Sequence, residues 1–476
     1  MDAQGCCQMN ASRYGRKSVA DKLFLFGELT LLCLSSWIAI LIHNTSHVVV
    51  SAEASLINIS VFAATVMLCA LSVGLYDHKL REGHKGVVKR VIITQVFSTI
   101  ILQFIVFQVF PSVYISALYL LCASVIAAIS VSLFRAFCQM QDINRISRRR
   151  ILILGAGKRA SIIERRMRRN VDRRDFEILG YVPIEGDEEA SIQQNRQISL
   201  DYSNNLFKFV MENKIDQLVI ACDERRNKLP VEDLFKCKTR GVDIIEILDF
   251  IENETGQIAV NLIYPSWIIH SNGLTSNRRF RTSLGYVLNV VLAVMLLLFT
   301  WPIMLITALL IYLEDGRKTS APVFYKQLRV GIDGSPFYIL KFRSMKTDAE
   351  KDGAQWASKN DNRVTKVGHY IRRYRIDELP QLFNVLKGEM GFVGPRPERP
   401  EFVVELAKNI PYYNNRHNVK PGLTGWAQLK YPYGATAEDA QEKLKFDLYY
   451  IKHRSLILDL VILIRTVEVV LFGRGR

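Results

Sequence analysis

The sequence lacks the patterns that mark several common protein classes. Its eight cysteines include no C-x-x-C pair with a matching partner, so neither a zinc site nor a disulfide framework is indicated. No zinc-finger or helix-turn-helix signature is present, and the net charge of +16 therefore does not indicate a nucleic-acid-binding protein. The first apolar run is too long for a signal peptide and has no cleavage site, so we expect a retained membrane anchor.

The apolar residues are gathered into long segments. Four of these lie in the first 140 residues, and each is about 20 residues long, enough to cross a hydrocarbon core of roughly 30 Å. Lys and Arg occur before the first segment, between the second and third, and after the fourth, whereas residues 44–55 contain neither. This pattern predicts a four-helix transmembrane bundle over residues 1–140 with both ends in the cytoplasm. The segments are residues 23–43, 56–76, 91–110 and 112–134.

Acidic residues are almost absent from these segments. Glu28, near the start of the first, is the exception. A transporter would place ionisable groups at mid-membrane. The bundle is therefore predicted to be an anchor.

A fifth apolar stretch, residues 284–313, contains Trp301-Pro302. Basic residues flank both of its ends, so both ends are expected on the cytoplasmic side. Proline removes a backbone hydrogen bond and clashes with the preceding turn. We therefore predict a helix–break–helix hairpin that re-enters the inner leaflet, with its kink at Pro302, in place of a simple span.

Residues 141–268 are predicted to form a Rossmann-like α/β domain. A short apolar strand runs into Gly155-Ala156-Gly157, and strands expected at 177–182, 217–222 and 242–247 alternate with helical patterns, which indicates a parallel sheet. The loop matches G-x-G-x-x-A, a turn that presents backbone N–H groups to a pyrophosphate.

The rest of a dinucleotide site is missing from this domain. The ribose-binding acid, expected about 20 positions after the loop, falls near Asp175 or Glu177, at the start of a strand and not at its end. A sugar-nucleotide epimerase or dehydratase would also need a Tyr-x-x-x-Lys pair, which residues 150–265 lack. A nucleotide-binding-like fold with a structural or regulatory role is therefore favoured over a bound dinucleotide.

The last part of the chain, residues 275–476, is dense in polar motifs, among them the adjacent carboxylates Asp377 and Glu378. Neighbouring residues cannot point the same way on a helix, but two carboxylates can share a divalent ion or divide the roles of nucleophile and base. Mg²⁺ suits such hard oxygen ligands beside phosphates. Taken alone, an Asp-Glu pair before Leu-Pro is also typical of a helix start.

Basic side chains from separate motifs accompany the carboxylates. Arginine and lysine in such positions suit phosphate oxygens. Proline on both sides of Arg396 restricts its backbone, and the glycines of residues 420–425 permit a tight turn with backbone near a ligand. The predicted phosphate-binding residues are Lys341, Arg343, Arg375 and Arg396.

Two long stretches, RIDELPQLFNVLKGEMGFVGPRP at residues 375–397 and KPGLTGWAQL at residues 420–429, resemble the bacterial sugar transferase family, the monotopic polyprenyl-phosphate hexose-1-phosphate transferases. The resemblance covers residues 275–476 closely. The whole chain is similar to the large form of the family, which has four spans, a nucleotide-binding-like domain and a catalytic domain. Among its subgroups, the chain looks most like those of exopolysaccharide synthesis in bacteria with the PEP-CTERM sorting system.

The resemblance implies a reaction at the cytoplasmic face of the bacterial inner membrane. A UDP-sugar and polyprenyl (undecaprenyl) phosphate would give polyprenyl-diphospho-sugar and UMP. Asp377 would be the nucleophile and bind Mg²⁺, and Glu378 would assist with the proton or the metal. The family's hairpin has Ser-Pro where this chain has Trp301-Pro302, so the kink is expected here without the serine contact.

The implied partners are a UDP-sugar, the lipid phosphate and the membrane, but no nucleic acid. The transferred sugar and a homo-oligomeric state are left open. The alternative from another class is a non-catalytic membrane scaffold or regulator with a nucleotide-sensing domain.

Overall fold

The computed structural model forms two compact units, Met1–Glu254 and Thr255–Arg476. The division into domains 1–140, 141–268 and 275–476 stays a prediction. The structure describes residues 24–43, 52–76, 84–103, 117–140, 148–167, 173, 176–187, 192–200, 206–224, 229–263, 279–317, 320–349, 362–431, 434 and 436–471.

Four described helices are long and apolar enough to cross a membrane: Phe24–His43, Glu53–Leu71, Ala117–Cys138 and Gly285–Glu314. The chain is therefore a membrane protein. The first three helices match the first, second and fourth predicted segments, and the second and third lie in α2 (Ala52–Ser72) and α5 (Ala117–Met140).

The third predicted segment, residues 91–110, falls partly in α3 (His84–Ile101). This helix starts with the basic sequence HKGVVKR and is not one of the four membrane-spanning candidates. Residues 104–110 of the predicted segment lie outside the described residues.

A buried ion pair ties the first helix to α5. Arg135 donates from Nη2 to Glu28 Oε2 at 2.9 Å and from Nη1 to the Leu75 carbonyl at 2.9 Å. Glu28 is only 1% exposed. A buried charge requires a partner, and Arg135 of α5 supplies it here.

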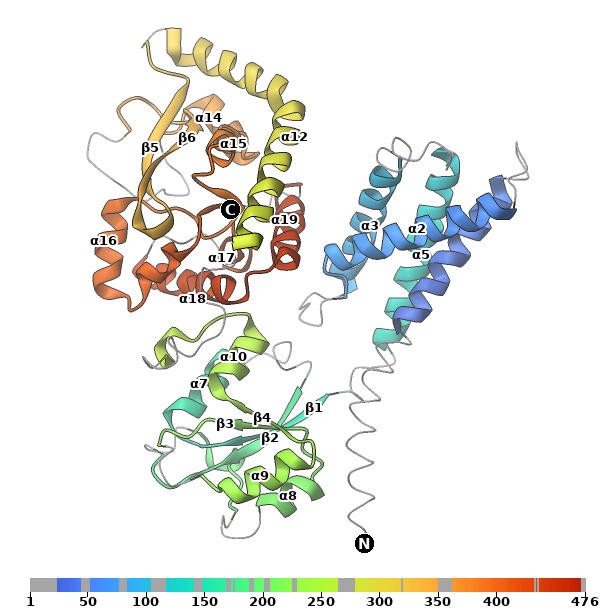
Figure 1. Ribbon diagram of the computed structural model, residues 1–476, viewed down its shortest axis with the longest axis vertical. Helices are drawn as coiled ribbons and strands as arrows, with labels where there is room; N and C mark the ends of the chain where they lie inside the picture. Colours follow the sequence, from blue (N-terminus) through green and yellow to red (C-terminus); the bar gives the residue numbers. More distant parts are fainter. Residues whose placement is uncertain are drawn as a thin grey trace. The chain divides into compact units, whose positions relative to one another are not determined.

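The middle region contains a four-stranded parallel sheet in the order β2-β1-β3-β4. Figure 1 shows the sheet between α7 and α10 on one face and α8 and α9 on the other. Residues 151–154 of the central strand β1 are fully buried, as an apolar strand covered on both faces should be. The elements are β1 (Arg149–Leu154), α7 (Lys158–Arg166), β2 (Phe176–Val182), α8 (Leu206–Glu212), β3 (Gln217–Ile220), α9 (Val231–Thr239), β4 (Asp243–Glu246) and α10 (Ile247–Thr255).

The parallel sheet expected from the sequence is thus confirmed. Of the two acids considered for ribose binding, Glu177 lies exposed at the start of β2, and Asp175 lies outside the described residues.

In the second unit, α12 (Arg279–Ile311) is one helix of 33 residues that continues through Pro302. It is followed by a π-helical turn, Tyr312–Gly316. The predicted break at Trp301-Pro302 is therefore not an interruption of the helix. Instead, α12 bends along its length in Figure 1, and an interior proline is the usual cause of such a bend. The re-entrant path over residues 284–313 stays a prediction.

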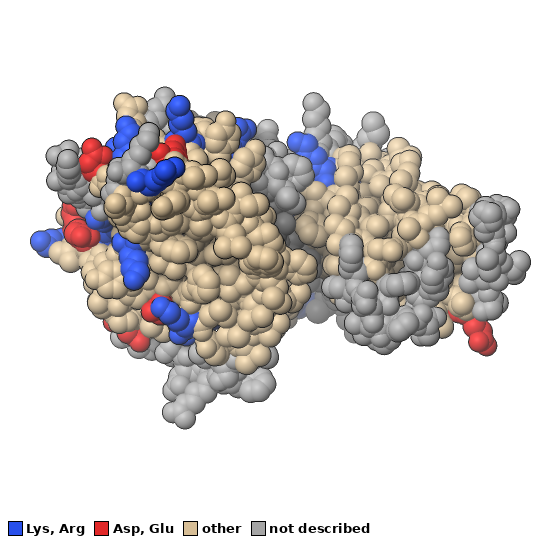
Figure 2. All heavy atoms as spheres, turned by 90° about the horizontal axis from the view of Figure 1, so that it is seen from above, with Lys and Arg blue, Asp and Glu red and all other residues tan. Residues whose placement is uncertain are grey.

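Only a narrow stripe of α12 packs onto the unit's core. Ala293 is fully buried against a cluster that includes Phe337, Leu382 and Val385. The remaining surface is apolar yet exposed, as Phe299 at 74% illustrates. Figure 2 shows a wide face of this unit without Lys, Arg, Asp or Glu, and charged atoms gathered at its margins. Such a face suits contact with lipid.

The rest of this unit combines short strands with helices. An antiparallel hairpin joins β5 (Phe324–Val330) to β6 (Pro336–Phe342), and β7 (Gly391–Val393) runs parallel to β8 (Gly422–Thr424). The helices are α14 (Lys366–Arg373), α15 (Gln381–Leu386), α16 (Pro400–Asn409), α17 (Trp426–Lys430), α18 (Ala437–His453) and α19 (Leu456–Leu471).

The linker after α10 packs within this second unit. Ile258 and Val260 are buried in its core, and Ile258 N donates to the Lys445 carbonyl at 3.0 Å. Trp426 Nε1 donates to the Gly256 carbonyl at 3.0 Å. Residues 256–260, which lie in the predicted middle domain, thus contribute to the core beneath the motif-rich part of the chain.

Candidate active site

Asp377 and Glu378 lie in a 3₁₀ turn, Ile376–Glu378, between α14 and α15. The preceding Arg375 has φ 59° and ψ 19°, a left-handed conformation that costs energy in any residue other than glycine. Pro380 then precedes the first residue of α15. The pair therefore stands in a turn before the helix, where its two side chains have different surroundings.

Three cationic side chains lie around the carboxylate of Glu378. Its Oε1 lies 3.0 Å from Arg396 Nη2, 3.4 Å from Arg375 Nη1 and 3.7 Å from Lys341 Nζ. Burial opposes ionisation of this carboxyl, but Arg396, Lys341 and Arg375 together hold its pKa well below the usual range. Glu378 is therefore an ionised carboxylate that interacts with cationic side chains from three segments of the chain.

Asp377 has the opposite surroundings. It is 8% exposed, and its Oδ1 is buried without a hydrogen-bond partner among the residues that the structure describes. Burial and the neighbouring Glu378 raise its pKa, while Lys341, Arg375 and Arg372 act against that rise. A buried carboxylate oxygen without a partner is unfavourable unless a ligand completes it.

Lys341 is positioned by β6, and β6 is held by an asparagine. Asn384 of α15 accepts from Leu340 N at 3.0 Å and donates to the Tyr338 carbonyl at 2.8 Å. Burial lowers the pKa of Lys341 to about 8, although Glu378 acts to raise it. Asn384 lies inside the RIDELPQLFN stretch, but no sequence pattern marked it as a supporting residue.

The predicted phosphate-binding residues are not all brought together. Lys341, Arg375 and Arg396 meet at Glu378. Arg343, just after β6, is 7% exposed, and its Nη1 and Nη2 have no hydrogen-bond partner within the described ranges. Arg372 of α14 was missed, although it belongs to the same basic run as Arg375; its charge favours ionisation of Asp377.

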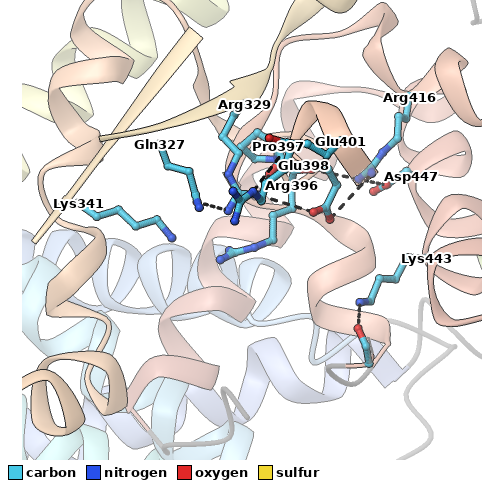
Figure 3. A network of polar contacts seen from close by, with 12 residues as sticks. Gln327, Arg329, Lys341, Arg396, Pro397, Glu398, Glu401, Arg416, Lys443 and Asp447 are labelled. Carbon is cyan, nitrogen blue, oxygen red and sulfur yellow. Dashed lines mark hydrogen bonds and ion pairs between the residues drawn. The ribbon is translucent and has the colours of Figure 1, made fainter. Parts of the chain in front are cut away.

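The loop that carries Arg396 is held by two further arginines (Figure 3). Arg416 Nη2 donates to the Arg396 carbonyl at 3.0 Å and to Asp447 Oδ2 at 2.9 Å. Arg329 Nη1 donates to the Pro397 carbonyl at 3.0 Å. Arg329, Arg416 and Asp447 lie outside the motifs, and no sequence pattern marked them.

The glycine-rich KPGLTG segment packs against the same loop. Gly422 N donates to the Pro395 carbonyl at 3.0 Å, and Gly394 N donates to the Thr424 carbonyl at 2.9 Å. A Cβ on Gly394 would come within 2.9 Å of the Pro421 carbonyl carbon, so a larger residue would push the two backbones apart. These glycines therefore let backbone approach backbone, and they help to fix the position of Arg396.

A magnesium ion fits the oxygen donors of this site. The described part of the chain contains no group of three or more His, Cys, Asp or Glu that could hold a metal ion. Mg²⁺ does not require one, because it usually binds through one or two carboxylates together with substrate phosphates and water. Asp377 has a buried oxygen without a partner, whereas Glu378 is engaged by cations. Asp377 is thus the fitting ligand.

Comparison with known proteins finds two family matches. The model of the bacterial sugar transferase family matches residues 280–473, which include every candidate site residue. A model described as a CoA-binding domain matches residues 72–245.

Several curated proteins are similar to this chain. The UDP-N-acetylgalactosamine-undecaprenyl-phosphate N-acetylgalactosaminephosphotransferase of Aeromonas hydrophila is 41% identical over 51% of this chain and 55% of its own length. The UDP-glucose:undecaprenyl-phosphate glucose-1-phosphate transferase of Escherichia coli (strain K12) is 35% identical over 57% of this chain and 58% of its own length. The chain thus spans little more than half the length of these two relatives.

A shorter relative is matched over most of its length. EpsL, an uncharacterized sugar transferase of Bacillus subtilis (strain 168), is 42% identical over 38% of this chain and 85% of its own length. The residues that the family model matches include Asp377, Glu378 and the three cations around Glu378. The chain belongs to the bacterial sugar transferase family.

Proposed function

We propose that the protein transfers a sugar-1-phosphate from a UDP-sugar to polyprenyl (undecaprenyl) phosphate, with release of UMP. The observation that carries this proposal is the buried, unpartnered Oδ1 of Asp377, next to a carboxylate that gathers three cations. The relatives from Aeromonas hydrophila and Escherichia coli (strain K12) are both named as transferases of this kind. A strongly cationic site with one available carboxylate oxygen suits a diphosphate substrate.

In the first step, a carboxylate oxygen of Asp377 attacks the phosphorus that carries the sugar. The bond from this phosphorus to the bridging oxygen breaks, UMP leaves, and an acyl phosphate remains on Asp377. In the second step, an oxygen of polyprenyl phosphate attacks the same phosphorus, and the bond to Asp377 breaks. This gives polyprenyl-diphospho-sugar and restores the carboxylate, so one difficult displacement becomes two easier ones.

Lys341, Arg375 and Arg396 bind and orient the diphosphate in this proposal. Glu378 keeps them within 3.7 Å of its Oε1 before the substrate arrives, so little reorganisation is needed when charge develops. Because its pKa is held well below the usual range, Glu378 acts through charge and position and not as a proton donor. Mg²⁺, held by Asp377, would neutralise part of the diphosphate charge when bound.

The membrane face of α12 is consistent with a lipid substrate. Its exposed apolar side chains need lipid around them, which would bring the site close to a lipid phosphate. We infer that the site faces the cytoplasm at the bacterial inner membrane, since the charge pattern of the loops favours that side, and that the product serves exopolysaccharide synthesis.

A UMP-release assay on the full-length protein in lipid nanodiscs tests the proposal. We expect UMP from one member of a UDP-sugar panel, only with polyprenyl phosphate and Mg²⁺ present. Asp377→Asn should lower the rate by about 10³-fold or more, as loss of a nucleophile does. Asp333→Asn is the matched control, because Asp333 is exposed in the β5–β6 turn at φ 53°, where asparagine is tolerated.

The covalent intermediate has a separate readout. Protein incubated with a UDP-sugar labelled in the sugar phosphate, without lipid acceptor, should retain label that hydroxylamine removes. Full activity of Asp377→Asn would refute the role of this residue. A wild-type protein that is inactive with every UDP-sugar, yet binds a nucleotide in residues 148–254, would favour the scaffold or regulator.

A further inference from the structure

The glycine loop of the parallel sheet lies where such folds bind nucleotides. It connects the end of β1 to the start of α7, between β2 and β3 in the sheet order. In open α/β sheets this is the point where strand order reverses and ligands bind. Gly155 has φ +120°, which lets the chain turn sharply, and the following N–H groups would normally face a pyrophosphate.

Two carboxylates of the chain occupy these N–H groups. Asp223, just after β3, accepts from Lys158 N at 2.9 Å and from Arg159 N at 2.9 Å. Asp187, five residues after β2, accepts from Ala156 N at 2.7 Å through Oδ2 and from Asp223 N at 3.2 Å through Oδ1. The carboxylates thus fill the loop from both neighbouring strands.

The packing around Gly157 indicates how closely they fit. A Cβ on Gly157 would lie 2.9 Å from the carboxylate carbon of Asp223 and 3.2 Å from Cβ of Asp187. In a dinucleotide fold the glycine at this position lets the pyrophosphate approach, and an acid after the second strand bonds the ribose. Here the glycine accommodates Asp223, and the acid after β2 bonds the loop.

We propose that Asp187 and Asp223 are built-in anions that take the place of a ligand pyrophosphate in this loop. They bind the amides of the loop and satisfy the positive end of the α7 dipole. A ligand diphosphate at the start of α7 would have to displace Asp223 from Lys158 N and Arg159 N, and it would meet the negative charge of both carboxylates. The residues therefore do not fit the pyrophosphate of CoA or of a dinucleotide, although the CoA-binding family model matches this region.

The first test measures binding to the wild-type full-length protein. CoA and NAD⁺ are titrated to millimolar concentration while hydrogen exchange is followed in peptides that cover residues 155–162. We expect no change in exchange there. Saturable protection of these residues by either compound would overturn the proposal, and this readout requires no variant.

The second test is a chemical rescue. Asp223→Ala should lower the Tm of the middle region by about 4 °C or more, the change expected when a helix loses a cap worth about 1 kcal/mol. Glu224→Ala is the matched control, because Glu224 is the exposed neighbour, and its Tm should stay unchanged.

Inorganic pyrophosphate should restore part of the lost Tm in Asp223→Ala and protect residues 155–162, and it should do neither in the wild type or in Glu224→Ala. An unchanged Tm in Asp223→Ala, or a lowered Tm that pyrophosphate cannot restore, would overturn the proposal that this carboxylate takes the place of a ligand pyrophosphate. Pyrophosphate bound at the candidate active site would protect residues 372–398 instead. The outcome is therefore independent of the transferase activity.

Discussion

Lys341 gives the proposed reaction a measurable upper pH limit. Burial lowers its pKa from 10.5 to about 8, although Glu378 acts to raise it. If protonated Lys341 binds the diphosphate, kcat/KM for the UDP-sugar should fall above pH 8. Each further pH unit should reduce it about tenfold, since kcat/KM follows the ionisation of the free enzyme. At pH 9, about one tenth of the maximum should therefore remain.

Two substitutions should move this limit in opposite directions. The arginine of Lys341→Arg stays charged throughout the pH range of the assay. Its kcat/KM should therefore not fall between pH 8 and 10, although the larger head group lowers the maximum kcat/KM. Glu378→Gln removes the charge that raises the pKa of Lys341, so its decline should begin below pH 8. The assay is UMP release at low UDP-sugar concentration, pH 6 to 10, with Mg²⁺ and ionic strength held constant.

Lys326→Arg is the matched control, because Lys326 is exposed on β5 directly opposite Leu340. It should retain the decline of the wild type. A Lys341→Arg enzyme that declines at the same pH as the wild type would refute the argument, since another group would then have to set the limit. A wild-type profile that stays flat to pH 10 would refute it as well.

The contacts that support the candidate site and the metal ion proposed there give three further predictions. Asn384→Ala removes the hydrogen bonds to Leu340 N and the Tyr338 carbonyl. It should lower the free energy of unfolding, measured by chemical denaturation, by about 1–3 kcal/mol. An unchanged free energy would contradict the role of Asn384 in holding β6. Arg416→Met leaves Asp447 buried without its cation and should cost about 3–5 kcal/mol by the same measurement, most of which Arg416→Met/Asp447→Leu should recover. Removal of Mg²⁺ with EDTA should abolish UMP release and added Mg²⁺ should restore it, whereas activity that survives EDTA would exclude the metal proposed at Asp377.

The sequence was informative where residue type alone determines the role. Apolar length and flanking charge predicted three of the membrane helices, because lipid leaves few alternatives to a long apolar helix. Strands that alternate with helices predicted the parallel sheet. In the candidate site, Lys341, Arg375 and Arg396 could be named because charged side chains in separate motifs suit one anionic ligand.

The supporting residues could not be predicted, because their roles depend on tertiary contacts. Arg416 and Arg329 act through backbone carbonyls of the loop at Arg396 and Pro397, and a single sequence does not show which carbonyl an arginine will reach. The path of α12 illustrates a different limit. Proline removes one hydrogen bond, and whether a helix then breaks or only bends depends on the packing around it.

The two carboxylates of the candidate site differ in their neighbours and not in their chemistry. Oε1 of Glu378 lies within 3.7 Å of three cations, which fixes its charge and withdraws the electron density that an attacking oxygen needs. Asp377 Oδ1 has no such contact among the described residues. The cations that favour ionisation of Asp377 act on it through space. The left-handed Arg375 begins the turn that separates these surroundings, and we infer that its backbone strain is the cost of keeping one carboxylate paired and the other available.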